Sequence, residues 1–401
     1  MNKIKSLLLG SAAMLIAVTG AQAADMPLTP AREPVYQCDI AGFYEIPGSD
    51  ICLRISGFAR FWMGGQNRDG VTHAFVDGGN TADVVANEVF GPINPVLDVN
   101  DADPFFMSAD FRVRFDARSA TSLGTVRAFA ELQAEDDNGN TGGALELRQA
   151  FVQVGNWVFG KTGSTFTVNR TGANYTNAIS TLDAVTIRIV QVRYTVPFGN
   201  GFALSVAIED PSYEEPTDGT LEVAANEFPN FVANLAYTGD RVAASLGGVL
   251  VYNDYFDGAD TSDELGWAIQ GSVEFSATDL LILGLLGTYS DGTSEYAPDL
   301  LGGGDNIAMD GFGNVLREVE IWSVGGFITA QFTPEFAANL IVGYGERDGA
   351  DSADLELFSG TVNVVYTPVD NLEFILEFTY ANEDVSGEED FLGVFQAVRS
   401  F

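Results

Sequence analysis

Histidine, cysteine and basic residues are scarce in this chain of 401 residues. It contains one histidine, His73, and two cysteines, Cys38 and Cys52, and its 19 basic residues are outnumbered by 56 acidic ones. A metal site is disfavoured, because His73 lies in a different segment from the two cysteines, and no cofactor is expected. The formal charge of −37 argues against a nucleic acid partner, since nucleic acids are bound by basic surfaces.

Long hydrophobic runs are also missing after the N-terminal segment. Hydrophobic residues make up 46% of the chain, yet no later run approaches the roughly 20 residues that a membrane-spanning helix needs. Helical membrane spans are therefore excluded on length. The apolar residues must be distributed over many short elements.

The first 23 residues have the pattern of a secretory signal peptide. Lys3 and Lys5 precede an apolar run over 7–18, and 21–23 read Ala-Gln-Ala, a cleavage site of the A-x-A type. The apolar run is too short to span a membrane. We therefore expect a signal peptide over 1–23, cleaved near Ala23 and Ala24, and a mature chain with 17 basic and 56 acidic residues.

Export decides how the two cysteines are interpreted. An exported chain meets an oxidising compartment, so a disulfide between Cys38 and Cys52 is expected. It would tie an N-terminal extension, 24–51, to the start of a single domain over 52–401.

From Cys52 onward the main pattern is alternation with period 2, which is typical of β-strands. In 106–118, Phe111 and Phe115 share the apolar parity, whereas Arg112 and Arg114 share the polar one. Such a strand meets apolar surroundings on one side and water on the other. The same pattern recurs at 125–135, with Phe129 as an exception, and at 264–275 and 372–380.

Sixteen strands of this kind are predicted, an even number, as single-chain bacterial barrels require. They cover 52–64, 105–118, 124–135, 144–154, 156–162, 185–196, 201–210, 229–238, 241–253, 264–275, 278–290, 317–332, 334–346, 354–367, 370–382 and 389–401. The connections between them alternate between long and short, which a barrel in an asymmetric membrane predicts. The fold class is therefore all-β: a 16-stranded antiparallel transmembrane β-barrel with short periplasmic turns and long extracellular loops.

Several phrases resemble the alphaproteobacterial branch of the trimeric, sixteen-stranded porins of Gram-negative outer membranes. They are MNKIKSLLLGSAA, CDIAGFYEIPGSDICLRISGFARF, GGALELRQAFVQVGNWVFGKT, VQVRYTVPFGNGFALS and the ending VRSF. The resemblance covers nearly the whole chain. It implies an outer-membrane homotrimer in contact with lipid and lipopolysaccharide, passive passage of small hydrophilic solutes and ions, and a third long loop that folds inward to narrow the pore.

By position this loop is 163–184, a polar segment with little charge. Its candidate constriction residues are Asn169, Arg170, Asn174, Asn177, Thr181 and Asp183. Many family members carry several acidic groups on this loop, facing a basic ladder. Here Asp183 is its only acid, so a strong transverse field is not expected.

Arginines are concentrated on the polar parity of the early strands, and this predicts a basic inner wall. Its members are Arg54, Arg60, Arg112, Arg114 and Arg127. Charged side chains that face lipid at mid-depth cost about 2–4 kcal/mol, whereas those in the lumen are solvated. Such a wall raises local anion occupancy. Alternatively, Arg112 and Arg114 simply pair with Asp110, Asp116 and Glu131 and neutralise the lumen. The acidic excess of the whole chain favours cations at the mouths and opposes the basic wall, so the net selectivity is not predicted.

Aromatic residues near strand ends predict interfacial girdles, with packing within the sheet as the alternative. The candidates are Trp62, Phe111, Trp267, Tyr289, Trp322, Tyr344, Tyr366 and Tyr380. The acidic stretch 98–103 resembles half of a calcium loop, but it lacks the glycine and the final glutamate of such loops, so no metal site is predicted.

Other functions fit less well. A hydrolase would need a nucleophile beside a base, and His73 has no accompanying G-x-S-x-G motif. A secreted adhesin with a sandwich fold would leave the alternating loop lengths unexplained. A channel selective for one nutrient remains open within the barrel hypothesis, although 163–184 has neither an aromatic track nor clustered carboxylates. A general diffusion channel is preferred.

Overall fold

The computed structural model describes Cys38 and residues 41–66, 105–136, 145–167, 187–211, 228–256, 261–298, 301, 307–309, 315–348, 355–383 and 388–401. The predicted signal peptide, His73, the acidic stretch 98–103 and the six candidate constriction residues lie outside this part of the chain. Among the described residues, no helix is long and apolar enough to cross a membrane.

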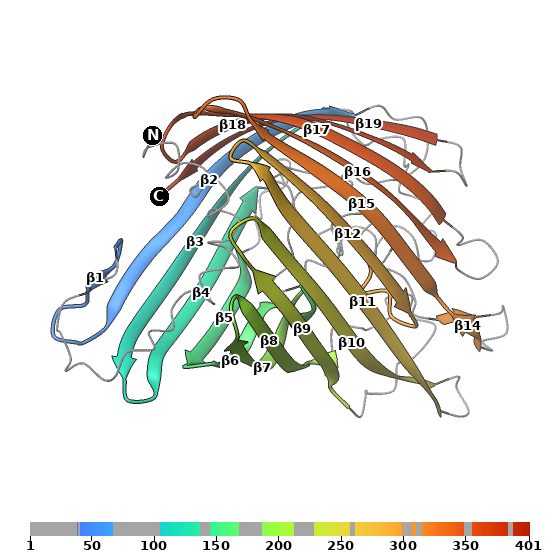
Figure 1. Ribbon diagram of the computed structural model, residues 1–401, viewed down its shortest axis with the longest axis horizontal. Helices are drawn as coiled ribbons and strands as arrows, with labels where there is room; N and C mark the ends of the chain where they lie inside the picture. The colour runs from blue at the N-terminus through green and yellow to red at the C-terminus, as the bar shows by residue number, and fades with distance from the viewer. Residues whose placement is uncertain are drawn as a thin grey trace.

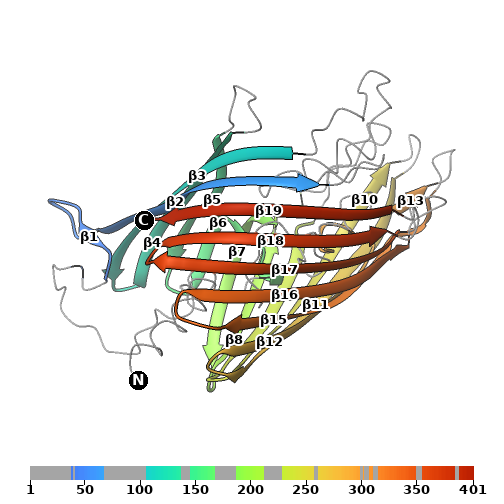
Figure 2. The same ribbon diagram turned by 90° about the horizontal axis from the view of Figure 1, so that it is seen from above.

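Sixteen antiparallel strands form one closed sheet (Figures 1 and 2). They are β2 (Cys52–Gln66), β3 (Phe105–Thr121), β4 (Gly124–Asp136), β5 (Leu145–Val154), β6 (Trp157–Gly163), β7 (Arg188–Phe198), β8 (Phe202–Glu209), β9 (Asn230–Thr238), β10 (Val242–Phe256), β11 (Thr261–Thr278), β12 (Leu281–Asp291), β15 (Glu320–Gln331), β16 (Phe336–Asp348), β17 (Leu355–Val369), β18 (Leu372–Glu383) and β19 (Glu388–Ser400). Each strand begins and ends within three residues of its predicted bounds. The all-β barrel prediction is confirmed.

The barrel closes where its last strand pairs with its first. Strand β19 runs antiparallel to β2, from Leu392 opposite Gln66 to Ser400 opposite Phe58. The chain end completes this seam, because Phe401 and Gly57 exchange two backbone hydrogen bonds of 3.0 Å. Figure 2 shows β19 lying beside β2, with the C-terminus at one end of the barrel.

Strand β2 continues beyond this seam, and the N-terminal segment covers its remaining edge. The short strand β1 (Tyr44–Glu45) pairs antiparallel with Leu53 and Cys52. A disulfide joins Cys38 to Cys52, with their Cα atoms 5.7 Å apart, so the predicted pairing is confirmed. The sequence analysis did not predict β1.

The two ends of the barrel differ in their connections. At one end, called the short-turn end, β5 and β6 are joined by two residues, as are β17 and β18. Gly155 and Asn371 in these turns adopt positive φ angles of 56° and 64°, a conformation that glycine and asparagine tolerate best. At the opposite, long-connection end, more residues separate the strands.

Outward-facing side chains are mostly apolar, and inward-facing ones are mostly polar. On β9, Phe231 and Leu235 are exposed on the outside, whereas Asn230 and Asn234 are fully buried inside the barrel. This inverts the arrangement of a soluble protein, in which apolar residues form the core.

Aromatic side chains form two outward-facing rows, one near each end of the barrel. The row near the long-connection end contains Trp267, Tyr289, Trp322, Tyr344, Phe358, Tyr380 and Phe391, and the row near the short-turn end contains Trp157, Tyr194, Phe198, Phe202, Tyr237, Phe336, Tyr366, Phe374 and Phe395. The prediction was wrong for Trp62, which is 1% exposed and packs with Leu392 and Val394. Trp62 lies on the same parity of β2 as Arg54 and Arg60, so it faces inward.

Candidate functional site: the inner wall and its inward segments

The five predicted arginines of the basic wall all lie on the inward-facing parity of β2, β3 and β4. Pairing between these strands places most of them directly opposite a hydrogen-bonding partner. Arg54 lies opposite Asp116, Arg60 opposite Asp110, Arg114 opposite Glu131 and Arg112 opposite Gln133. Residues directly opposite each other on one face are close enough for their side chains to interact.

One carboxylate, that of Asp116, is shared by three guanidinium groups. Arg118 and Arg127 each donate two hydrogen bonds to it, at 2.9–3.0 Å. Arg54 approaches the same carboxylate at 3.5 Å. Three guanidinium groups therefore gather around this carboxylate.

A second group of arginines lies further along the same wall, around Glu131. Arg114 forms an ion pair with one oxygen of Glu131, and Arg148 approaches the other oxygen at 3.3 Å. Arg148 also lies 3.4 Å from Glu146. Arg112 donates two hydrogen bonds to the neutral side chain of Gln133. On this part of the wall, Arg114 and Arg148 are therefore paired with carboxylates, whereas Arg112 donates to a neutral amide.

A β-bulge in β5 places Arg148 in this group. The pairing between β4 and β5 shifts between Glu131 and Leu132, which lie opposite Gln149 and Leu147. A bulge adds one residue to one strand. As a result, two consecutive side chains, Arg148 and Gln149, reach the same oxygen of Glu131, at 3.3 and 3.4 Å. The sequence analysis missed Arg148.

Aromatic rings on the inner wall support several of these arginines. The guanidinium of Arg127 lies 4.7 Å from the ring centre of Phe129 and 5.2 Å from that of Phe151. Phe129 and Phe151 stack on each other at 5.1 Å. Such cation–π contacts hold a guanidinium without neutralising it. Phe129, the exception in the alternation pattern of β4, therefore faces inward.

The N-terminal segment contributes a similar contact. Phe43 lies under two guanidinium groups, with its ring centre 4.9 Å from that of Arg54 and 5.1 Å from that of Arg118. Phe43 is thus held on the inner side of the wall at the short-turn end.

The wall formed by β9–β12 and β15–β19 carries mainly neutral polar groups. Its buried polar side chains are Asn230, Asn234, Ser245, Asn253, Gln270, Ser272, Thr288, Ser290, Ser323, Asn339, Ser359, Thr361, Asn363, Glu377, Thr379 and Gln396. Several bond to one another, as Asn339 does to Asn363 at 2.7 Å. Among these residues only Glu377 is charged, and it accepts a 3.0 Å hydrogen bond from Asn363. The arginines therefore concentrate on the wall of β2–β5, whereas the inward parity of the opposite wall also carries Glu274, Glu373 and Arg347.

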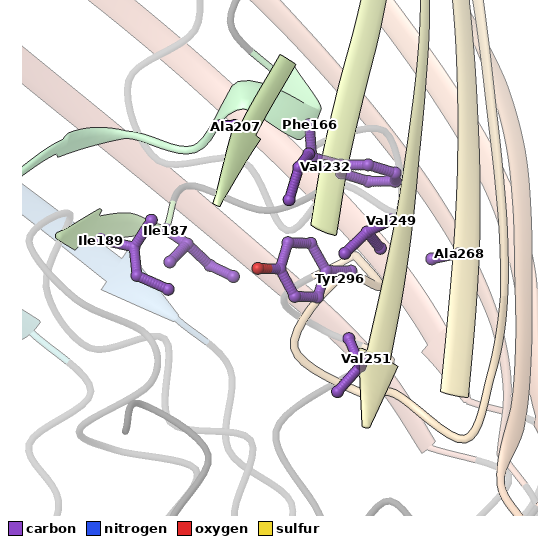
Figure 3. Packing of buried hydrophobic residues seen from close by; sticks show 9 residues of the cluster. All are labelled: Phe166, Ile187, Ile189, Ala207, Val232, Val249, Val251, Ala268 and Tyr296. Atoms are coloured by element: carbon purple, nitrogen blue, oxygen red, sulfur yellow. The ribbon is translucent and has the colours of Figure 1, made fainter. Parts of the chain in front are cut away.

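The described start of the third long connection folds into the barrel. It contains a short 3-10 helix, η3 (Thr165–Thr167), and Phe166 is completely buried. In Figure 3, Phe166 lies among Val232, Val249 and Tyr296. The inward direction agrees with the prediction for this loop.

Comparison with known proteins agrees with the barrel fold described above. A protein-family model described as "Porin subfamily" matches residues 25–391. This chain belongs to the Porin subfamily. The porin is 27% identical to porin Omp2b of Brucella suis biovar 1 (strain 1330) over 427 aligned residues, which cover 99% of each chain.

Two solved structures share the fold at low sequence identity. The outer-membrane channel DcaP of Acinetobacter baumannii is 20% identical, with a TM-score of 0.69, and the match covers 90% of this porin and all of DcaP. OmpT of Vibrio cholerae, described as an in-vitro folded trimer form, is 11% identical, with a TM-score of 0.57, and covers 88% and 99% of the two chains.

Family membership assigns the barrel to the bacterial outer membrane, where it acts as a channel. The short-turn end is then periplasmic and the long-connection end extracellular. The two aromatic rows lie where such barrels meet the membrane interfaces. Arg399, which faces outward among apolar residues, reaches the periplasmic turn and donates a 2.6 Å hydrogen bond to the carbonyl of Asp370.

Proposed function

We propose that this porin is a homotrimeric, water-filled channel for passive diffusion of small hydrophilic solutes and ions, with a basic wall that favours anions. The observation that carries the selectivity is the concentration of arginines on the inner face of β2–β5, where Arg54, Arg118 and Arg127 gather around Asp116. Full neutralisation of the wall would require about as many acids as arginines. Arg112 departs from such pairing, because its guanidinium donates to the neutral amide of Gln133.

Anions gain from this arrangement because the arginines act on a narrow aqueous path. Rings of Arg or Lys side chains are the usual means by which pores favour anions. Arg112 has the largest part in the proposal, since its guanidinium donates to the neutral amide of Gln133 and lies over the ring of Phe58. The overall acidity of the chain acts in the opposite direction at the mouths.

In this channel the third long connection narrows the pore. Asn169, Arg170, Asn174, Asn177, Thr181 and Asp183 remain candidate constriction residues. The buried start of this connection supports the assignment, because Thr165 and Phe166 already lie inside the barrel. The divisions at 23/24 and 51/52 likewise remain predictions.

Trimer formation is supported by small outward-facing residues on the early strands. Ala59 on β2, and Ala128 and Ala130 on β4, leave room for a neighbouring barrel to approach closely. OmpT, a structural relative, is itself described as a trimer form. We expect lipid and lipopolysaccharide to contact the rest of the apolar outer surface.

The test is single-channel recording of the refolded protein in a planar bilayer, with a salt gradient across the membrane. We expect each insertion event to give three equal conductance steps, one for each barrel of a trimer. The reversal potential should have the sign that indicates anion preference. Cross-linking in mild detergent should give a species of three chains. A protein that inserts without conducting would refute the channel. A cation-selective reversal potential would refute the role of the basic wall but leave the channel function standing.

A further inference from the structure

A second segment, besides the start of the third long connection, lies inside the barrel. It follows β12, and its described residues are 292–298 and 301. Tyr296, Ala297 and Leu301 are each at most 1% exposed, although none belongs to a barrel strand. A connection that remained outside the barrel would leave such side chains in water. This segment is called the inner segment below.

The inner segment packs against the inner wall in two places. Tyr296 joins a cluster with Val232, Val249 and Phe166 (Figure 3). Ala297 and Leu301 join a second cluster, formed with Val319, Ile321, Leu357 and Ala381. Apolar inward-facing residues on these strands therefore have a partner, although most of the inner wall is polar.

Glycines on the wall provide the space for this packing. A Cβ atom at Gly266 would lie 2.3 Å from the carbonyl oxygen of Gly292, and one at Gly345 would lie 2.3 Å from Cδ1 of Leu301. Both distances are far below van der Waals contact. Asn253 adds a 2.7 Å hydrogen bond to the carbonyl of Gly292. The wall sequence is thus fitted to the inner segment.

A single carboxylate connects the inner segment to the third long connection. Glu209, 1% exposed at the end of β8, accepts hydrogen bonds from the backbone N–H of Thr165 at 2.6 Å and from the hydroxyl of Ser164 at 2.8 Å. It also accepts one from the hydroxyl of Tyr296 at 3.0 Å. The rings of Phe166 and Tyr296 meet edge to face, with centroids 5.4 Å apart.

We propose that the inner segment is a second constriction element, and that Glu209 is the positioning residue that fixes it and the start of the third long connection in one arrangement. This inference rests on the proposed channel function. It assigns part of the size limit of the pore to residues 292–298 and 301, which occupy lumen cross-section beside β9, β10, β15, β17 and β18. Displacing them would widen the path for solutes.

Two glycine substitutions on β11 form a matched pair for the test. Gly266 faces inward against Gly292, whereas Gly271 faces outward, and a Cβ there would meet nothing nearer than Leu246 at 3.9 Å. Gly266→Val should displace the inner segment and raise single-channel conductance by about twofold, because one of two narrowing elements is lost. Gly271→Val should leave the conductance unchanged.

Tyr296→Ala and Glu209→Gln extend the test in case Gly266→Val does not fold. Tyr296→Ala removes the ring from the cluster, and Glu209→Gln weakens the contacts to Thr165, Ser164 and Tyr296 together. Both should admit larger neutral sugars in liposome-swelling assays, a readout that a loss of stability alone would not move. Folding is checked by heat-modifiable migration on gels.

The outcomes separate this inference from the channel function. If the unmodified protein conducts and all three variants retain its conductance and sugar size limit, the second constriction is refuted while the channel stands. If Gly266→Val and Gly271→Val raise conductance equally, the effect is not due to the inner segment, and the inference is again overturned. A non-conducting unmodified protein refutes the channel and, with it, the inference.

Discussion

Arg118 and Arg127 lie directly opposite each other on β3 and β4, and both guanidinium groups bind the carboxylate of Asp116. Like charges in directly opposed positions repel each other. The pair is stable here because each arginine donates two hydrogen bonds to Asp116, whose side chain is almost completely shielded from solvent. Asp116 is therefore the residue that makes this concentration of positive charge possible.

Removing the charge of Asp116 should reduce stability and increase anion preference together. In Asp116→Asn, three guanidinium groups lose their shared counter-charge. Losing a charged hydrogen-bond partner that is buried costs about 1–3 kcal/mol, to be measured by denaturant unfolding in lipid vesicles. The reversal potential in a salt gradient should move towards that of a more anion-selective pore. Unchanged stability and selectivity would contradict the role given to this carboxylate.

Neutralising Arg112 should move selectivity in the opposite direction. Arg112→Gln removes a charge whose guanidinium donates to the neutral amide of Gln133, and Glu131 keeps its contacts with Arg114 and Arg148. We expect a shift of the reversal potential towards cations, with little change in stability. Arg399→Gln is the control, since Arg399 contacts the periplasmic turn outside the lumen. An equal shift in both variants would show that only total charge matters.

The disulfide should stabilise the N-terminal segment rather than the barrel. Cys38 and Cys52 lie 14 positions apart in the sequence, and a disulfide that closes a loop of this size contributes about 3 kcal/mol of stability in the chain-entropy description. The double variant Cys38→Ser/Cys52→Ser should become sensitive to proteases within 41–51. Heat-modifiable migration of the barrel should be unchanged. Loss of barrel folding in the double variant would refute this division of roles.

An outward-facing charge in the middle of a strand should be costly. Val362 is half-exposed on the outer face of β17, near the centre of the strand. Arg at the membrane midplane costs about 2–4 kcal/mol in such barrels, so Val362→Arg should lower the free energy of unfolding by this amount. The neighbouring Thr361 faces inward, and Thr361→Lys should be tolerated better. Equal costs would contradict the assignment of the two faces.

The strands were predictable because alternation is a local property. Each strand places one parity in apolar surroundings and the other in water, so the pattern can be read without knowing the neighbouring strands. The inward parity of Arg54, Arg60, Arg112, Arg114 and Arg127 could be read from the sequence for the same reason. Their parity relative to Phe111 and Phe115 was visible in the sequence.

Features that depend on a partner strand were not predictable in this way. The segment LELRQAFVQV gives no sign that two residues, Arg148 and Gln149, face the same partner, because a bulge is defined by the pairing with β4. Trp62 was misplaced because an indole at a strand end suggests a membrane interface, whereas its parity places it inside. Greater weight on parity would have corrected this prediction.

The inner segment was missed for a related reason. Nothing in the sequence distinguishes Gly266 and Gly345 from the many other glycines. Their role in leaving space for Gly292 and Leu301 can be recognised only from the packing. Contacts between a loop and a distant wall leave no periodic signal. The short strand β1 also escaped, since its partner residues are supplied by the exposed edge of β2.

The seam between β2 and β19 determines when the barrel can form. Its pairing joins residues near position 60 to residues near position 397, so no closed intermediate exists until the last strand has been synthesised and exported. Because these residues are far apart in the sequence, closing the loop between them costs entropy before any contact has formed, and this makes folding slow. Until then β2 and β19 are two open edges able to pair with other chains. The transit of this porin through the periplasm is therefore the interval in which it is most exposed to aggregation, and in which a chaperone that shields strand edges has the greatest effect on its yield.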